Sequence, residues 1–225
     1  MKTIGILGGM GPEATAVLYL KIIKIFQERY GAKYDADFPK IFICNLPLPD
    51  VVEAVDTGKV VRDCLIQAVR ELESVGVDFI AIPCNTVSYF QEEVRKAVSI
   101  PVLSLPEEVA KFVGIKEFQK VGLLGTEMTI KTNIYGTALR GIELIVPSVE
   151  KIRQMTPILM NILSGLKKEE DRCFGIDLIN ELKSQGAEAV ILGCTELPLL
   201  INGRDNLIDT IELLAEVVVA KAISI

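Results

Sequence analysis

The segment SVGVDFIAIPCNT at residues 74–86 and the segment SQGAEAVILGCTE at residues 184–196 follow one pattern, 110 positions apart. In each, a serine and a glycine precede an acidic residue, an apolar run typical of a buried strand, and a cysteine. A second pair, IGILGGM at 4–10 and VGLLGTE at 121–127, recurs with an offset of 117. Two segments that repeat in the same order at nearly the same offset predict two similar halves rather than one continuous sheet.

Around these repeats, short apolar runs alternate with stretches of helical periodicity. The predicted strands cover residues 3–8, 39–44, 78–83, 101–104, 120–125, 142–146 and 187–192. The predicted helices cover 13–29, 58–75, 88–98, 128–139, 149–165, 169–185 and 209–223. Strands that are apolar throughout and alternate with helices are typical of parallel sheets covered on both faces. We therefore expect an α/β fold of two pseudo-symmetric three-layer αβα lobes with mainly parallel sheets and an active site in the cleft between them.

The boundary between the two lobes is expected near residues 100–106, where two prolines flank a short predicted strand. The final predicted helix is expected to cross back and cover the first lobe. The first α/β lobe would then comprise residues 1–103 plus 209–225, and the second would comprise residues 104–208.

Composition narrows the possible chemistry. The chain has 225 residues, of which 50% are apolar and none is histidine or tryptophan. The apolar fraction is too high for a disordered chain. Without histidine the chain cannot form a Ser-His-Asp triad, a Cys-His pair or a zinc site with histidine ligands. Acid/base chemistry must come from Cys, Asp, Glu, Lys or Tyr.

Charge and cysteine content bear on partners and compartment. The formal net charge is −6 and basic residues form no cluster, so a nucleic-acid partner is not expected. No run of 18 apolar residues lacks charges and no A-x-A cleavage site follows the N-terminus, so neither a membrane span nor export is expected. The five cysteines form an odd set without C-x-x-C, which favours reduced thiols in a cytoplasmic protein over disulfides or a metal site.

Cys84 and Cys194 are the candidate catalytic residues, because each follows a predicted strand and precedes a predicted helix. Strand-to-helix loops of a parallel sheet line its crevice, and the start of a helix favours a thiolate. Two thiols on opposite sides of one carbon could remove a proton from one face and deliver another to the opposite face, which is racemisation by two bases. The neighbouring Asn85, Thr86 and Thr195 could hold a carboxylate and an amino group.

A structural role is the alternative for any of these thiols, because cysteine is often buried. It is the interpretation we prefer for Cys44, Cys64 and Cys173, which lie inside apolar strand or helix patterns.

Four motifs resemble the aspartate/glutamate racemase family of cofactor-independent amino-acid racemases. They are GILGGMGPEAT at 5–15, PCNT at 83–86, KVGLLGTEMTIKTNIY at 120–135 and VILGCTELPLL at 190–200. The resemblance implies two αβα lobes, Cys84 and Cys194 as the acid/base pair, and neither metal nor pyridoxal phosphate. It suggests a homodimer acting on a small amino-acid substrate. It also implies substrate-binding roles for Met10, Gly11, Asn85, Thr86, Thr126 and Thr195.

Three positions depart from this resemblance. Members acting on acidic amino acids commonly carry an arginine after the Pro-Asp of the loop that follows the second strand, where this chain has Val51. They also tend to carry a histidine where Ser88 stands and a lysine near Leu163. An aliphatic side chain cannot replace a guanidinium that binds a carboxylate. Lys167 and Lys168 are nearby and would take the lysine position if the alignment slips. We hypothesise that specificity has moved away from aspartate, unless Arg62, Lys131 or Arg153 supplies the missing charge.

Two other functions remain open from the sequence. Residues 9–14, GMGPEA, satisfy G-x-G-x-x-A between a predicted strand and a predicted helix, with Asp35 or Asp37 somewhat over twenty residues further on, as in a dinucleotide-binding module. A catalytically silent small-molecule binder on the same fold is the other alternative. Within the superfamily, isomerisation, decarboxylation and hydantoin racemisation use the same cysteine positions.

Overall fold

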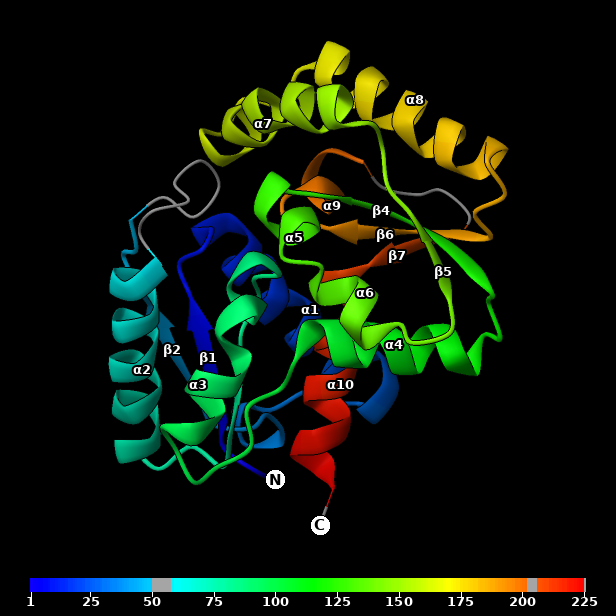
Figure 1. The fold of residues 1–225 in the computed structure, drawn as a ribbon. Helices are drawn as coiled ribbons and strands as arrows, with labels where there is room; N and C mark the ends of the chain where they lie inside the picture. Colours follow the sequence, from blue (N-terminus) through cyan, green and yellow to red (C-terminus); the bar gives the residue numbers. More distant parts are fainter. Residues whose placement is uncertain (50–57, 202–205, 225) are drawn as a thin grey trace. The chain divides into compact units, whose positions relative to one another are not determined.

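A computed structural model of the chain describes residues 1–49, 58–201 and 206–224. The chain folds into two compact units, one formed by Met1–Leu105 with Ile211–Ile225 and the other by Pro106–Thr210. Each unit is an α/β structure with a wholly parallel sheet, as the alternation of strands and helices predicts (Figure 1).

The first unit contains a three-stranded sheet in the order β2-β1-β3. The strands are β1 (Ile4–Gly8), β2 (Ile41–Asn45) and β3 (Phe79–Ala81), and β1 lies in the middle. Val102 forms a parallel bridge to Ile80, so the predicted strand at 101–104 is present only as this single bridge. The helices of this unit are α1 (Pro12–Tyr30), α2 (Gly58–Ser74), α3 (Gln91–Lys96) and α10 (Thr210–Ile223), with short 3-10 turns at Asp35–Asp37 and Thr86–Phe90.

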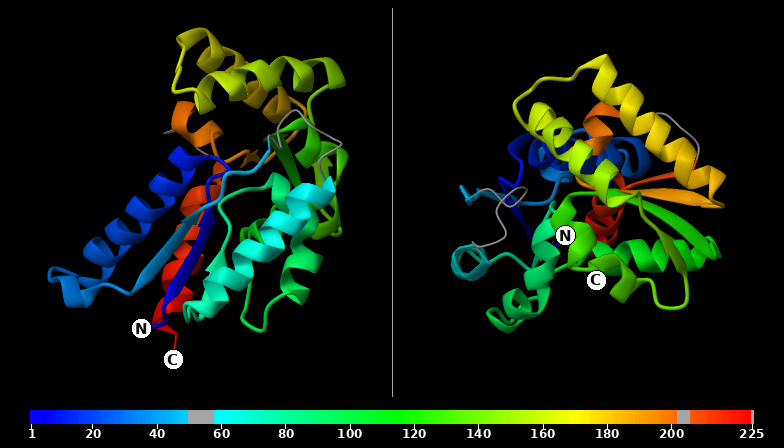
Figure 2. Two further views of the ribbon diagram at one scale, coloured as in Figure 1. Left: turned by 90° about the vertical axis from the view of Figure 1, so that its left-hand side faces the viewer. Right: turned by 45° about the horizontal axis from the view of Figure 1, so that its top comes forward.

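Alternating side chains of β1 face two separate apolar clusters. Ile4 and Ile6 pack with buried residues of α1 and α10, whereas Leu7 packs with buried residues of α2. Because successive side chains of a strand point to opposite faces, the sheet is covered by helices on both sides. Figure 2 shows the resulting three layers, with α1 and α10 on one face of the first sheet and α2 on the other.

The final helix returns to the first unit. Lys21 and Arg29 of α1 form ion pairs with Glu212 and Glu216 of α10. The backbone N–H of Lys2 donates to the carbonyl of Ala222 at 2.8 Å, so both chain ends lie side by side on this unit (Figure 2).

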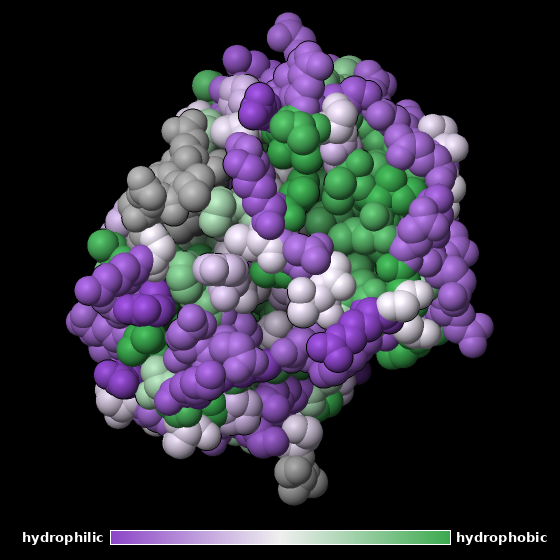
Figure 3. Space-filling model, in the orientation of Figure 1, coloured by the Kyte–Doolittle hydropathy of each residue, from purple (hydrophilic) through white to green (hydrophobic). Residues whose placement is uncertain are grey.

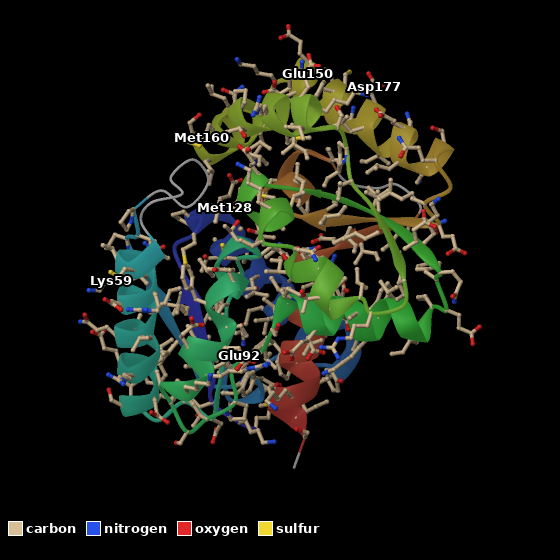
Figure 4. The ribbon with its side chains drawn as sticks, in the orientation of Figure 1. Lys59, Glu92, Met128, Glu150, Met160 and Asp177 are labelled. Carbon is tan, nitrogen blue, oxygen red and sulfur yellow. The ribbon has the colours of Figure 1, made fainter. Side chains whose placement is uncertain are left out.

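The second unit contains a four-stranded parallel sheet in the order β5-β4-β6-β7. The strands are β4 (Lys120–Gly125), β5 (Glu143–Ile145), β6 (Ala189–Gly193) and β7 (Leu207–Asp209). The helices are α4 (Leu105–Ile115), which begins at the boundary, α5 (Glu127–Lys131), α6 (Ile134–Ala138), α7 (Val149–Leu163), α8 (Glu169–Ser184) and α9 (Leu197–Leu200). Leu124, Val190 and Leu192 pack with buried residues of α7 and α8. Glu150 on α7 and Asp177 on α8 are exposed and point away from the sheet (Figure 4).

The acidic residue of the repeated segments has the same structural role in both units. Asp78, directly before β3, accepts a hydrogen bond from the backbone N–H of Thr3 at 2.5 Å. Glu188, directly before β6, accepts hydrogen bonds from the backbone N–H groups of Gln119 at 2.6 Å and Lys120 at 2.9 Å. Each carboxylate therefore ties the start of one strand to the start of its neighbour.

Three further differences from the sequence-based expectation concern α4, β7 and the predicted helix 128–139. The helix α4 was not predicted. It can begin at Leu105 because proline is tolerated in the first turn of a helix, where Pro106 lies. The strand β7 was not predicted, since it is a three-residue edge strand within a polar stretch. The predicted helix 128–139 is divided into α5 and α6 at Asn133, which adopts a left-handed conformation with φ of 54°.

Candidate functional site

Cys84 lies in the loop that follows β3 in the first unit. Its side chain is buried, with 5% exposure, and packs in the same apolar cluster as Leu7 and α2. The hydroxyl of Ser88 donates to the carbonyl of Cys84 at 3.5 Å. Asn85 is 2% exposed and Thr86 is half-buried, so the polar residues predicted to accompany the thiol lie in one short turn beside it.

Met10 and Gly11 lie in the loop that follows β1. This loop is held by Thr15, whose Oγ1 accepts a hydrogen bond from the Gly9 N–H at 3.0 Å and donates to the Gly11 carbonyl at 2.9 Å. Met10 packs against the apolar cluster that contains Cys84. Because β1 and β3 are paired and parallel, both loops emerge at the carboxyl edge of the first sheet.

Cys194 directly follows β6 in the second unit and is 6% exposed. Its Sγ donates a hydrogen bond to Oε2 of Glu196 at 3.0 Å, and Oγ1 of Thr195 donates to the same oxygen at 3.1 Å. Thr195 and Glu196 are both buried, so all three polar side chains are almost fully removed from water. A glycine is needed just before the thiol, because a Cβ at Gly193 would lie 2.5 Å from Cδ1 of Leu123.

Thr126 follows β4, the strand that pairs with β6. Gly125 and Gly193 are register partners, so Thr126 and Cys194 leave the sheet at the same level of two neighbouring strands. Oγ1 of Thr126 accepts a hydrogen bond from the N–H of Thr129 at 3.0 Å and is 2.9 Å from the Thr129 hydroxyl. Thus the second unit brings Thr126, Thr195 and Cys194 to one edge, as the first unit does for Met10, Gly11 and Cys84.

The helices that follow the two thiols are short. Cys84 precedes a 3-10 helix of five residues and the six-residue α3, and Cys194 precedes α9, which has four residues. A short helix aligns few peptide dipoles, so the dipole contribution to thiolate stability is smaller than expected. The neighbouring side chains are therefore more important for the protonation of each thiol.

The remaining cysteines lie inside strands or helices and not in these loops. Cys44 is in β2, Cys64 in α2 and Cys173 in α8. Burial, with a smaller contribution from Glu71, raises the pKa of the Cys44 thiol. A raised pKa keeps this thiol protonated near neutrality, in accordance with a structural role.

A cavity of about 190 Å³ borders Thr129. It is lined mainly by apolar side chains, among them Leu123, Ile130, Leu144 and Val146. Figure 3 shows apolar side chains gathered in this area of the second unit, around β5.

The acidic partner of the dinucleotide-binding pattern is in the wrong place. In that pattern an acidic residue follows the second strand and faces the glycine-rich loop. Here Asp35 and Asp37 precede β2, in a 3-10 turn where Asp37 accepts hydrogen bonds from the N–H groups of Lys33 and Tyr34. They are at the amino edge of the first sheet, whereas the loop containing Gly9 is at its carboxyl edge. Asp35 and Asp37 therefore do not supply the acidic residue that a dinucleotide-binding module needs.

The described residues offer neither a metal site nor a membrane-spanning helix. Within residues 1–49, 58–201 and 206–224, cysteine, aspartate and glutamate side chains form no group of three or more that could bind a metal ion. Among the helices of the same residues, none has both the length and the apolarity of a membrane span.

A sequence profile described as Asp/Glu/Hydantoin racemase matches residues 7–218. The chain belongs to this family. Among its relatives is the broad specificity amino-acid racemase RacX of Bacillus subtilis (strain 168), which is 33% identical over 200 residues, covering 88% of this chain and 87% of RacX. A glutamate racemase of Sulfurihydrogenibium sp. is 30% identical over 173 residues, covering 74% of this chain and 65% of that protein. Racemases are isomerases, and this member of the Asp/Glu/Hydantoin racemase family is an enzyme of that class.

Solved structures of the family share the fold over the whole chain. A putative Asp/Glu racemase from Yersinia pestis has a TM-score of 0.86 and 26% identity, with complete coverage of both chains. An aspartate racemase homologue from Pyrococcus horikoshii OT3 has a TM-score of 0.81 and 29% identity, again with complete coverage. The Picrophilus torridus aspartate racemase has a TM-score of 0.84 and 26% identity, covering 99% of this chain and 94% of that one.

The positions at which this family member departs from the expected pattern are only partly described. Val51 lies outside the described residues. Leu163 is the last residue of α7 and is 39% exposed, and Lys167 and Lys168 follow it in the connection to α8. The three cations that could supply the missing charge lie on helices. Arg62 pairs with Asp63 at 2.8 Å, Lys131 pairs with Glu127 at 2.7 Å, and Arg153 is exposed on α7.

Three polar residues of these loops were not among the predicted site residues. Thr15 and Thr129 are buried one helical turn beyond the first loop of each unit, and Glu196 is buried beside Cys194. The sequence offers only a weak signal for the threonines, because a threonine early in a helix is common. The signal for Glu196 is its place two residues after a candidate catalytic cysteine.

Proposed function

We propose that the protein is a cofactor-independent amino-acid racemase in which Cys84 and Cys194 are the two acid/base groups. The observation that carries the proposal is that each unit places one buried thiol directly beyond a strand at the carboxyl edge of its parallel sheet, within the repeated segment. Membership of the Asp/Glu/Hydantoin racemase family and the names of its relatives support the reaction class.

The proposed reaction needs two proton transfers on opposite faces of one α-carbon. One cysteine thiolate removes the α-proton and becomes a thiol, and the other cysteine thiol donates its proton to the opposite face and becomes a thiolate. The electron pair of the broken C–H bond stays on the α-carbon until the new C–H bond forms. An ordinary thiol pKa of about 8.5 is close enough to neutrality for both forms to be accessible. Both groups belong to the chain, so this route requires neither pyridoxal phosphate nor a metal.

The same proposal gives the polar residues of the loops a substrate-binding role. Asn85, Thr86, Thr126 and Thr195, with the Met10–Gly11 segment, would hold the α-carboxylate and the α-amino group. Their support is their position at the carboxyl edges of the two sheets, next to the thiols. Hydroxyl, amide and backbone N–H groups there can bind a carboxylate and also stabilise the charge that develops on it during proton removal.

Exchange of the α-proton for deuterium tests the mechanism. C84S and C194S should each lose about 100- to 10,000-fold in racemisation, since each removes one acid/base group. C173S is the matched control and should keep full activity, because Cys173 is an exposed residue of α8. Full racemisation in either C84S or C194S would mean that the protein does not use two cysteine bases. If the wild type binds amino acids but does not exchange their α-proton, the protein is a catalytically silent binder.

We propose a substrate range that is not centred on aspartate. The support is Val51, in place of the arginine expected for binding a side-chain carboxylate, together with the broad specificity named for the Bacillus relative. Deuterium exchange measured across acidic, neutral and basic amino acids should show the fastest turnover with a substrate other than aspartate. Aspartate as the best substrate by a wide margin would contradict the proposal.

We also propose that the protein is a homodimer in the cytoplasm. The five cysteines all lie in the described part of the chain and carry thiols rather than disulfides, which supports a reducing compartment. Light scattering coupled to gel filtration should give a mass of twice 24.7 kDa, and a mass of 24.7 kDa would contradict the dimer.

A further inference from the structure

We propose that the Glu196 carboxylate keeps the Cys194 thiol protonated. Cys194 is then the acid, and not the base, of the resting enzyme. This inference rests on the proposed racemase function, which requires one thiol and one thiolate. In it Glu196 is a positioning residue that acts on the substrate only through the sulfur of Cys194.

The contact geometry supports a shared proton. Sγ of Cys194 donates to Oε2 of Glu196 at 3.0 Å, and Oγ1 of Thr195 donates to that same oxygen at 3.1 Å. Cys194 is 6% exposed and Glu196 is 5% exposed, so water competes little for either group. An ionised carboxylate only accepts hydrogen bonds, and two donors directed at one oxygen are the arrangement that suits it.

The proton can lie on either atom without any change in net charge. If it moves from Sγ to Oε2, the S–H bond breaks, an O–H bond forms, and a thiolate faces a carboxylic acid. An ordinary carboxyl group is more acidic than an ordinary thiol by about four pK units, so the thiol with the carboxylate is the favoured form. Loss of that proton to solvent would leave two negative charges in contact, which is disfavoured. Glu196 therefore favours the thiol form of Cys194.

The two repeated loops differ at this position. Aligning Cys84-Asn85-Thr86 with Cys194-Thr195-Glu196 places Thr86 at the position of Glu196, and a threonine hydroxyl does not ionise near neutral pH. The carboxylate thus distinguishes two segments that are otherwise similar. An enzyme at rest with Cys194 protonated takes the α-proton on the Cys84 side first.

Among residues 1–49, 58–201 and 206–224, the other charged groups on α7 and α8 are exposed or have partners of their own. Glu150 and Arg153 of α7 are exposed, Lys151 of α7 forms an ion pair with Glu181 of α8, and Asp171 of α8 accepts a hydrogen bond from Asn161. Asp209 is half-buried at the end of β7, which pairs with β6. Asp209 therefore shares this edge of the sheet and is included in the test.

The pH dependence of iodoacetamide alkylation at Cys194, measured by peptide mass spectrometry, tests the inference without relying on racemase activity. The wild type should show a midpoint above the ordinary value of about 8.5. E196Q should lower the midpoint by about one pH unit, because the neutral amide no longer repels the thiolate. E196D keeps the charge, so its midpoint should stay closer to that of the wild type.

The chain contains a matched control. Sγ of Cys173 donates to Oε1 of Glu169 at 3.9 Å, in an exposed thiol–carboxylate pair on α8. E169Q should leave the Cys194 midpoint unchanged. In the wild type and in the variants of Glu196 and Asp209, where Glu169 is intact, Cys173 serves as the reference thiol in the same sample. D209N removes another negative charge at this edge of the sheet, and it should move the Cys194 midpoint less than E196Q does.

Several outcomes would overturn the inference. They are a wild-type midpoint at or below 8.5, an unchanged midpoint in E196Q, or an equal shift in E196Q and in either E196D or D209N. The wild-type titration alone decides the matter if E196Q does not fold. If E196Q lowers the midpoint as expected but C84S and C194S keep full racemisation, the proposed function fails while the control of the Cys194 proton by Glu196 stands.

Discussion

At the residue scale, one hydroxyl group shapes the loop that contains Met10 and Gly11. Thr15 bonds to both Gly9 and Gly11, and its side chain occupies the space that a Cβ at Gly8 would need. T15V keeps the shape of the side chain but removes the hydroxyl, which leaves the Gly9 N–H without this acceptor.

We expect T15V to lower the free energy of unfolding by about 1–3 kcal/mol. T15S keeps the hydroxyl and should be less damaging. Urea unfolding of the two variants measures the difference, and a T15V protein as stable as the wild type would show that the loop does not depend on this hydroxyl.

A second residue-scale prediction concerns the glycine before Cys194. A Cβ at Gly193 would lie 2.5 Å from Cδ1 of Leu123 and 3.0 Å from the backbone oxygen of Leu124. We expect G193A to be destabilised by about 1–3 kcal/mol through overpacking, and to change the alkylation rate of Cys194 as β6 shifts. Its control is G114A in α4, where a Cβ meets no atom within 4 Å among the described residues.

G114A should be neutral or more stable by about 0.5–1 kcal/mol, because glycine in a helix is less favourable than alanine. Thermal unfolding compares the two variants. Equal effects of G193A and G114A would mean that the contact between β4 and β6 is not tight at this point.

At the element scale, α10 completes the core of the first unit. Its buried residues, Ile211, Leu214, Ala215, Val218, Val219 and Ala222, are at most 1% exposed and pack with Ile4, Ile6 and α1. Burying one large aliphatic side chain contributes about 1.5–3 kcal/mol, so the four large residues of α10 together match the whole stability of a typical domain.

Removal of residues 210–225 should therefore unfold the first unit. Hydrogen exchange should show loss of amide protection in β1, β2 and β3, whereas β4 and β6 should stay protected. The control E216Q removes only an exposed ion pair with Arg29 and should have a small effect. Retained protection in β1 after truncation would contradict this role of α10.

Most elements, and the parallel arrangement within each sheet, could be predicted from the apolar pattern, because long buried strands and amphipathic helices leave strong periodic signals. The prediction missed α4 because Pro106 and Pro101 indicate a connection when taken alone. It missed β7 because a three-residue edge strand has too little pattern. The repeated cysteines identified the candidate thiols, whereas the contact of Glu196 with Cys194 depends on side-chain geometry that spacing cannot supply.

At the scale of the whole molecule, the pH dependence of stability follows from carboxylates. Hydrogen bonds from the hydroxyl and the backbone N–H of Ser99 lower the pKa of Glu73. A carboxylate whose pKa is depressed in the folded state stabilises the protein above its unfolded pKa of about 4.3, and this stabilisation is lost as the pH falls through the folded value.

The difference in unfolding free energy between the wild type and E73Q should be present at pH 7 and absent in strong acid. E28Q, at an exposed residue of α1, is the control and should match the wild type at both pH values. Because the chain has no histidine, stability should also stay nearly flat between about pH 6 and pH 8. A difference for E73Q that persists unchanged in strong acid would contradict the role of the Ser99 contact.

The return of the chain to its first unit sets an order of assembly during synthesis. All residues of the second unit, Pro106–Thr210, leave the ribosome before the segment Ile211–Ile225 that the first unit needs. Domains generally fold as units while the chain is still being made. The N-terminal half must therefore wait, with Ile4, Ile6 and Phe26 still uncovered by α10, until that segment has been synthesised. Nascent chains of this protein would thus complete the later-encoded unit first, and they would expose the unfinished one to chaperones in the meantime.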